Sequence, residues 1–133
     1  MSDYFEQCRS NYIRVKDKEA FQAFLGRFDG VVAMIEDKTG RVGFVAPDGL
    51  PDIPEDVENS GEEFDFINDL AEHLADNEVL IVMGSGSDGV KYIVGYAIAI
   101  NNRKERREVN LDDIYELAKE LTTAPKSITH AEY

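Results

Sequence analysis

The spacing of hydrophobic positions changes along the chain, and each change predicts an element. Asn11–Val15 alternates polar and apolar residues, as a strand with one buried face does, whereas residues 1–10 show no period and are expected to form a loose arm. Asp17 can cap a helix, and the apolar residues after it keep the spacing of one helix face: Phe21, Phe24, Leu25 and Phe28. The sequence therefore predicts a strand and then a helix that ends at Asp29-Gly30.

The middle of the chain predicts a hairpin, a long loop and a second helix. Val31–Glu36 and Arg41–Ala46 are apolar runs on either side of Asp37–Gly40, whose residues favour a turn. Pro47–Gly61 is rich in proline and glycine, and we expect it to be a loop. Glu62–Asn77 then predicts a helix, with an apolar face that consists of Ile67, Leu70, Ala71 and Leu74.

The last part of the chain predicts a second hairpin and a third helix. Glu78–Met83 and Val90–Ile100 are expected to be strands joined by the turn Gly84–Gly89, and residues 101–110 a charged connection. Asn110 stands at the N-cap position of the third helix, which ends before Pro125. The apolar stripe of this helix is expected to be buried: Leu111, Ile114, Tyr115, Leu117, Ala118 and Leu121.

The order of these elements, β-α-β-β-α-β-β-α, predicts an α+β fold. We expect an antiparallel sheet of about five strands with three helices on one face, and the first six elements follow the ferredoxin-like order. A chain of 133 residues suits one domain, residues 1–133, with residues 1–10 and 126–133 as loose ends. Nine side chains are expected to share one core: Phe21, Phe24, Leu25, Ile67, Leu70, Leu74, Ile114, Leu117 and Leu121.

Composition narrows the classes of function. The formal net charge of −13 argues against nucleic acid and anionic membranes as direct ligands, because both attract clustered lysine and arginine. Cys8 is the only cysteine, so no internal disulfide can form. The N-terminus lacks the apolar core of a signal peptide, and the longest apolar run, Tyr92–Ile100, is far shorter than a membrane span. A cytoplasmic location is the expectation.

The negative charge is concentrated in one part of the sequence. Val42–Val90 contains thirteen acidic residues and neither lysine nor arginine, whereas the rest of the chain balances fourteen acids with fourteen bases. Five acids of the second predicted helix have spacings of three and four, which would place them in one stripe opposite the apolar face: Glu62, Asp65, Asp69, Glu72 and Asp76. Four acids of the preceding loop would extend this surface: Asp52, Glu55, Asp56 and Glu58. Such a surface serves either solubility or docking to a basic partner.

Several motifs of known chemistry fail on closer reading. Gly84–Gly89 matches G-x-G-x-x-G, but a dinucleotide cradle needs a helix after the glycines, and Val90–Val94 predicts a strand. No spacing of cysteine and histidine suits zinc, and the acids of residues 48–63 lack the calcium-loop order. Cys8 has only Arg9 beside it to activate a thiol. We therefore predict no catalytic residue, no metal ligand and no cofactor.

One basic cluster stands apart from the acidic window. Residues 103–107 contain four of the fourteen basic residues of the chain. The cluster is expected to be a solvated loop, with docking on the acidic helix of a second copy as the alternative.

Three segments carry a resemblance to other proteins. Asn11–Phe21, Tyr96–Asn101 and Asp112–Tyr115 resemble small uncharacterised proteins of phages, plasmids and integrative elements. The resemblance extends over most of the chain but includes no catalytic motif. It implies a setting in which small acidic proteins often block nucleic-acid-binding defence machinery.

Three hypotheses on function follow. The first is a non-enzymatic protein-binding domain that docks its acidic surface on the basic surface of a nucleic-acid-binding protein, as an inhibitor that mimics DNA phosphates. The second is an immunity protein that neutralises a basic toxin through the same electrostatics. The third is a small enzyme or ligand-binding domain with its site over the sheet. Convergent polar groups in a pocket would favour the third hypothesis, and a flat acidic face the first.

Overall fold

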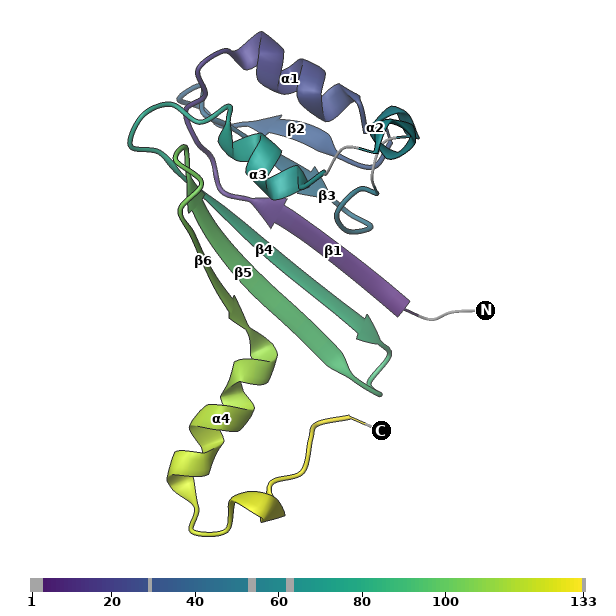
Figure 1. The fold of residues 1–133 in the computed structure, drawn as a ribbon, viewed down its shortest axis with the longest axis vertical. Coiled ribbons are helices and arrows are strands. Elements are labelled where there is room, and N and C mark those ends of the chain that lie inside the picture. Colours follow the sequence, from purple (N-terminus) through teal and green to yellow (C-terminus); the bar gives the residue numbers. More distant parts are fainter. Residues whose placement is uncertain (1–3, 29, 53–54, 62–63, 133) are drawn as a thin grey trace.

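The described residues form one six-stranded sheet and four α-helices (Figure 1). The computed structural model describes residues 4–28, 30–52, 55–61 and 64–132, without the side chains of residues 55 and 56. The strands are β1 (Tyr4–Ser10), β2 (Ala33–Glu36), β3 (Val42–Ala46), β4 (Val79–Asp88), β5 (Ile93–Asn101) and β6 (Arg106–Asn110). The helices are α1 (Lys18–Gly26), α2 (Glu55–Ser60), α3 (Phe66–Ala71) and α4 (Ile114–Ala118).

The sheet is antiparallel and open, with the strand order β2-β3-β1-β4-β5-β6. The α+β class with an antiparallel sheet is therefore confirmed, with six strands instead of about five and four helices instead of three. The ferredoxin-like arrangement is not confirmed. The two predicted hairpins are present as β2–β3 and β4–β5, and β6 extends the second one.

The first strand is not where the sequence predicts it. Residues 4–10, expected to be a loose arm, form β1, which lies inside the sheet between β3 and β4. Asn11–Val15, expected to be the strand, makes only isolated bridges at Ile13 and Val15. The alternation is weak in β1 because only Cys8 and Ser10 are buried, so most of the strand has no apolar face for a pattern to mark.

The helix α1 and the hairpin β2–β3 form as predicted. Asp17 caps α1, since its carboxylate accepts hydrogen bonds from the backbone N–H groups of Glu19 and Ala20 at 2.9 and 3.2 Å. The turn of the hairpin is held by Asp37, which accepts from the hydroxyl of Thr39 at 2.7 Å and the backbone N–H of Arg41 at 3.0 Å. These hydrogen bonds, that of Thr39 first, lower the pKa of Asp37.

The second predicted helix is much shorter than expected. Residues Glu62–Asn77 were expected to be helical, but α3 spans only Phe66–Ala71, and the predicted loop before it contains α2. Asp65 caps α3 by accepting from the N–H groups of Ile67 and Asn68 at 3.0 and 3.2 Å. After Ala71 the chain leaves the helix, and the side chain of Leu74 is buried in the core. The backbone of Leu74 forms an isolated β-bridge with Val15. Tertiary contacts thus override the helical period of this segment.

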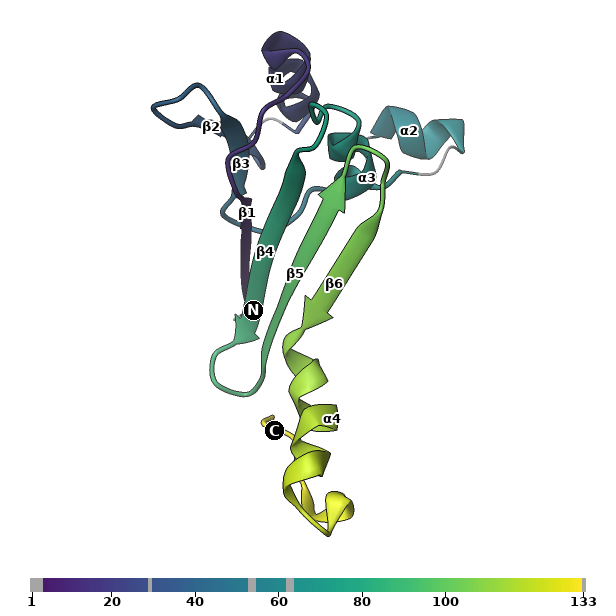
Figure 2. The ribbon, with the colours of Figure 1, turned by 90° about the vertical axis from the view of Figure 1, so that its left-hand side faces the viewer.

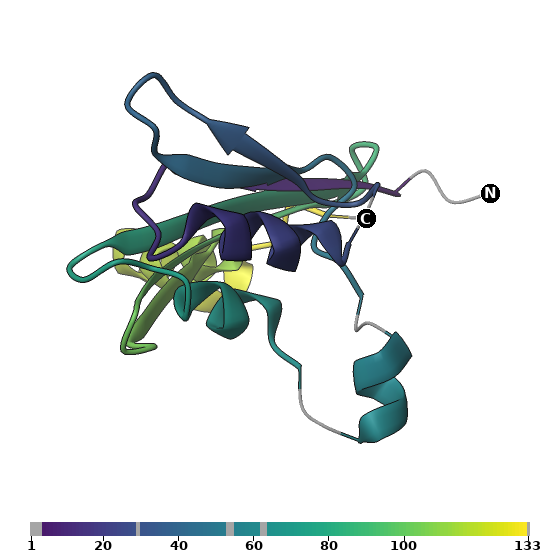
Figure 3. The ribbon, with the colours of Figure 1, turned by 90° about the horizontal axis from the view of Figure 1, so that it is seen from above.

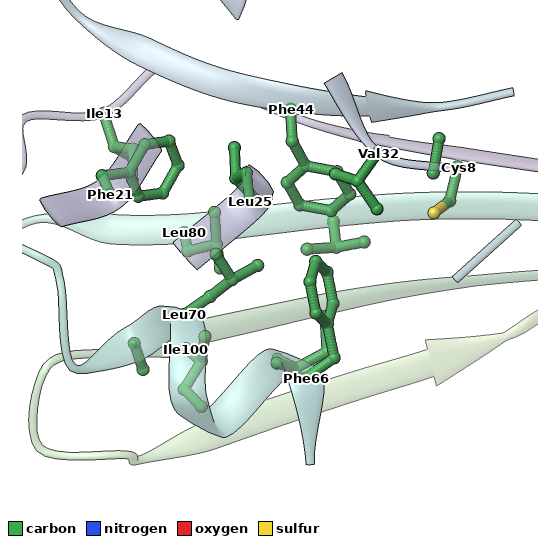
Figure 4. Packing of buried hydrophobic residues seen from close by; sticks show 14 of the residues in the cluster. Cys8, Ile13, Phe21, Leu25, Val32, Phe44, Phe66, Leu70, Leu80 and Ile100 are labelled. Atoms are coloured by element: carbon green, nitrogen blue, oxygen red, sulfur yellow. The ribbon is translucent and has the colours of Figure 1, made fainter. Parts of the chain in front are cut away.

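The hydrophobic core lies between one face of the sheet and the helices α1 and α3 (Figures 3 and 4). We call this face of the sheet the inner face. Phe66 links the layers, because its ring packs edge-on against Phe28 and Phe44 at centroid distances of 5.2 and 5.4 Å. Of the nine expected core side chains, Phe24 is partly buried. Five are buried: Phe21, Leu25, Ile67, Leu70 and Leu74.

The last helix does not join this core. Ile114, Leu117 and Leu121 were expected to be buried, but they are 59, 56 and 89% exposed. The reason is the direction of the chain, because β6 passes directly into a 3-10 turn and α4, which extend beyond the sheet (Figures 1 and 2). The residues after α4 are not a loose end. Ala131 donates its N–H to the hydroxyl of Tyr115 at 2.7 Å, and Glu132 bridges to Tyr92.

Candidate functional site

The acids predicted to form one helical stripe lie in different settings. Asp65 precedes α3 as its cap, Asp69 lies within the helix and Glu72 follows it. Asp76 lies beyond the helix, where it accepts a hydrogen bond from Asn102 at 2.9 Å. Glu62 is outside the described residues. The continuous stripe of the sequence prediction is therefore not formed, because the helix that would carry it is too short.

The basic cluster neutralises part of this surface within the same chain. Lys104 lies 2.9 Å from Glu72, and Arg106 lies 3.4 Å from Asp65. The hydrogen bond from Lys104 lowers the pKa of Glu72, and the same bond raises the pKa of Lys104. The expectation that residues 103–107 form only a solvated loop is wrong, because the β5–β6 turn brings two of their cations onto acids of their own chain.

Other acids of the window have no cation beside them. Asp48, Asp52 and Glu58 are exposed, and in the described part of the chain none of the three makes a side-chain hydrogen bond or ion pair. We call these three residues the unpaired acids. Burial, and then the nearby Glu72, raise the pKa of Asp69. The side chains of Glu55 and Asp56, predicted to belong to this surface, lie outside what the structure describes.

The glycine-rich segment belongs mostly to a strand. Gly84 and Gly86 lie within β4, and the turn of the hairpin begins at Gly89, so the predicted turn Gly84–Gly89 is placed too early. A side chain at Gly84 would collide with the ring of Tyr96, and one at Gly86 with the ring of Tyr4. As predicted, strand β5 follows and not a helix. The glycines make room for tyrosine rings and do not frame a helix N-terminus that could hold a phosphate.

Cys8 lies beneath this tyrosine cover and is buried. Burial raises the pKa of its thiol to about 11, although a hydrogen bond from Tyr96 acts in the opposite direction. The thiol is therefore protonated at neutral pH and is a poor nucleophile. Among the described residues, no group of three histidine, cysteine or acidic side chains could hold a metal ion.

The face of the sheet that the sequence reasoning overlooked is the one opposite the core. We call it the outer face, and we take it as the alternate residues of the strands that point away from α1 and α3. On the longer strands these are Phe5, Gln7, Arg9, Val79, Ile81, Met83, Ser85, Ser87, Ile93, Gly95, Ala97, Ala99, Arg107 and Val109. Many of these side chains are apolar and exposed; Met83 and Val109, for example, are 60 and 61% exposed.

The overlooked signal was the continuous apolar run. A strand with one wet face alternates apolar and polar residues, whereas residues 79–83 and 96–100 contain no charged or strongly polar residue. Such runs are typical of strands buried on both faces. The helices of the described part of the chain cover only one face of this sheet.

Three neighbouring hollows lie along the outer face. Two of about 460 Å³ share Gln7, Pro47 and Ser85, and one of about 340 Å³ lies between Met83 and Leu111. Ser85 lines all three, so the hollows form one continuous groove across the strands. The part of the groove near Leu111 is lined mainly by apolar groups and by backbone, and no charged side chain lines it.

Comparison of the chain with family models, with curated proteins and with solved structures gives no match. Among the described residues, no helix is both long enough and apolar enough to cross a membrane. Arguments on function therefore depend on the surfaces described above.

Proposed function

We propose that this chain is a non-enzymatic protein-binding domain that docks on a basic protein surface through its unpaired acids. The observation that carries the proposal is their position: Asp52 precedes α2 and Glu58 lies within it, whereas the cations Lys104 and Arg106 pair with other acids, Glu72 and Asp65. A like-charged surface without interspersed lysine or arginine attracts a basic partner and accelerates its association.

The partner class that fits this surface is a protein that binds nucleic acid. The basic surface of such a protein is built to hold a line of phosphates, and carboxylates on an exposed turn and helix offer the same sign of charge. The resemblance of the chain to small proteins of mobile elements supports an inhibitory role of this kind. An immunity protein against a basic toxin would use the same surface, and identification of the captured partner separates the two.

The experiment compares two variants of equal charge. Asp52→Lys with Glu58→Lys changes the proposed surface, and Glu19→Lys with Glu132→Lys makes the same change in net charge at exposed positions outside the acidic window. Each tagged protein is used to capture partners from a host lysate, and the retained proteins are identified by mass spectrometry. We expect the wild type and the control variant to retain the same basic protein, and the Asp52/Glu58 variant to lose it.

Salt and nucleic acid then test the mechanism of the contact. Retention should fall as salt rises, because the Debye length shrinks from about 10 Å at 0.1 M to about 3 Å at 1 M. Duplex DNA or RNA should displace the captured protein if the acids occupy a phosphate track. Equal retention by the two variants, or retention that does not respond to salt, would refute acidic docking.

A further inference from the structure

Two apolar surfaces of this chain are uncovered in the described structure, and one is a groove and the other a ridge. The groove is that of the outer face. The ridge is the C-terminal helical segment, residues 111–121, whose side chains Ile114, Leu117 and Leu121 are more than half exposed. Monomeric soluble proteins rarely expose contiguous apolar patches of more than a few hundred Å². Both surfaces therefore call for a partner.

The segment cannot cover the outer face of its own chain. Asn110 is both the last residue of β6 and the cap of the following helical turn, and its N–H donates to the carboxylate of Asp113 at 2.8 Å. No loop residue separates strand from helix, so the segment continues away from the sheet (Figure 2). To reach the groove of its own copy, the segment would have to reverse its direction without a connecting loop.

The two surfaces match in size. Eleven helical residues span about 16 Å at 1.5 Å per residue. The outer face of β1, β4, β5 and β6 is about 14 Å wide, since neighbouring strands lie about 4.8 Å apart. The surfaces are also continuous, because Leu111 begins the segment and lies against Gly95 of the outer face, where an added Cβ would be 3.0 Å from its Cδ1 atom.

Charge favours the helical segment as the occupant of the groove. The strand residues of the outer face include no aspartate or glutamate among the described residues, in a chain with 27 of them, and two acids, Glu6 and Asp48, line only one end of the groove. It carries Arg9 on one side and Arg107 on the other, and neither makes an ion pair with any part of the chain that the structure describes. The segment carries four acids and one base beside its apolar stripe: Asp112, Asp113, Glu116 and Glu120, with Lys119 at 2.9 Å from Glu116.

We propose that two copies of this chain form a symmetric dimer, in which the C-terminal helical segment of each copy packs into the outer-face groove of the other. A two-fold axis uses both surfaces twice and leaves neither exposed. The same patch, groove and ridge together, then meets itself on the second copy. Asp48 lines one end of the groove, but Asp52 and Glu58 line none of its three hollows, so the dimer and the basic partner share no more than one of the unpaired acids.

The first experiment measures the mass of the full chain in solution by sedimentation or light scattering, from about 1 μM to about 100 μM. We expect twice the chain mass of 14.9 kDa, with dissociation at the lowest concentrations. Leu117→Asp with Leu121→Asp changes the ridge, and Met83→Glu changes the groove. Because these side chains are already exposed, the monomer of each variant should unfold at the same temperature as the wild-type monomer. The dissociation constant of the dimer should rise at least about tenfold.

The matched control is Val90→Asp, which places a charge on an apolar side chain that is 80% exposed in the β4–β5 turn, outside the groove. This variant should dimerise as the wild type does. A chain that is monomeric at every concentration would refute the proposal. A dimer that the Met83 and Leu117/Leu121 changes leave intact would also refute it.

A second experiment identifies the contact itself. Leu117→Cys and Met83→Cys are prepared as separate proteins with different tags, mixed and oxidised gently, while the buried Cys8 serves as an internal unreactive thiol. A mixed disulfide between the two proteins should form readily. The control mixture, Leu117→Cys with Val90→Cys, should yield much less. Equal yields in both mixtures would show that the segment does not lie in the groove.

Discussion

The inner and outer faces of the sheet are built from the same strands, yet they differ in cover and in charge. On the inner face, Leu80 and Val82 are fully buried under the helices, and acids such as Glu36 and Glu108 take part in ion pairs at its margins. On the outer face, Ile81 and Met83 of the same strand are exposed and no described acid is present. Burial within one chain therefore accounts for only half of the hydrophobic pattern of β4, and the other half indicates an external contact.

The largest expected difference is between a leucine of the core and a leucine of the helical segment. Leu70→Ala should lower the free energy of unfolding by about 2–5 kcal/mol, because it leaves a cavity between α3 and the sheet. Leu121→Ala makes the same chemical change at a side chain that is 89% exposed, and the monomer should lose no more than about 0.5 kcal/mol. Chemical denaturation at a concentration that keeps the chain monomeric measures both. Equal losses would mean that residues 111–121 belong to the core after all.

A smaller effect is expected in the part of the inner face that the helices do not cover. There the rings of Tyr96 and Tyr4 lie over Gly84 and Gly86. Gly84→Ala should destabilise the chain by about 1–3 kcal/mol, because the new methyl group meets the ring of Tyr96. Gly26→Ala is the control, since its new methyl group meets open space in a helix and should stabilise by about 0.4–1 kcal/mol. Thermal or denaturant unfolding of both variants provides the comparison. A neutral Gly84→Ala would show that Tyr96 moves aside without cost.

The smallest expected effect is a dependence on pH that only the covered face should show. His73 packs against Phe21 and Phe24 at centroid distances of 5.9 and 5.2 Å, and burial lowers its pKa. The unfolded chain then binds the proton more readily than the folded chain, so stability is present above the ordinary histidine pKa of about 6.5 and is lost as pH falls through it. Glu72 and Asp69 act in the opposite direction on the pKa of His73 and limit the effect.

The measurement is the free energy of unfolding at about pH 7.5 and about pH 5.5, in the wild type and in His73→Gln. The wild type should lose more stability over this range than the variant. His130→Gln is the control, because His130 is exposed where it stacks on Tyr115. A wild-type pH dependence that the His73 change leaves intact would show that another group titrates.

Local chemistry made parts of the fold predictable from sequence. The cap Asp17, the turn around Asp37 and the continuous run of β5 each determine their own structure within a few residues, and all three were predicted. The errors lie where distant contacts decide. β1 has little pattern because it is largely exposed, and the predicted helix Glu62–Asn77 is cut short because Leu74 is drawn into the core.

The surfaces were less predictable than the fold. The sequence shows in which segment the acids are concentrated, but their spacing could not show that the β5–β6 turn returns Lys104 to Glu72. The apolar stripe of α4 was recognised from the sequence, but its side chains are exposed. A helical spacing of apolar residues indicates that one face of the helix is buried, but it does not show whether the same chain or a second molecule buries it. Whether this helix packs in the core of its own chain or against another molecule depends on the direction of the chain at the end of β6.

The absence of acids from the outer face has a consequence for how two copies would meet. Each chain carries a net charge of −13, so long-range repulsion turns away most encounters between copies. Approaches that bring Arg9 and Arg107 of one outer face toward the acids of the other copy's helical segment meet less repulsion than other approaches do. The repulsion therefore selects the orientation in which two copies meet. Added salt weakens this selection and should ease self-association, while it slows capture of a basic partner. Ionic strength would therefore shift the balance between the two kinds of complex in opposite directions.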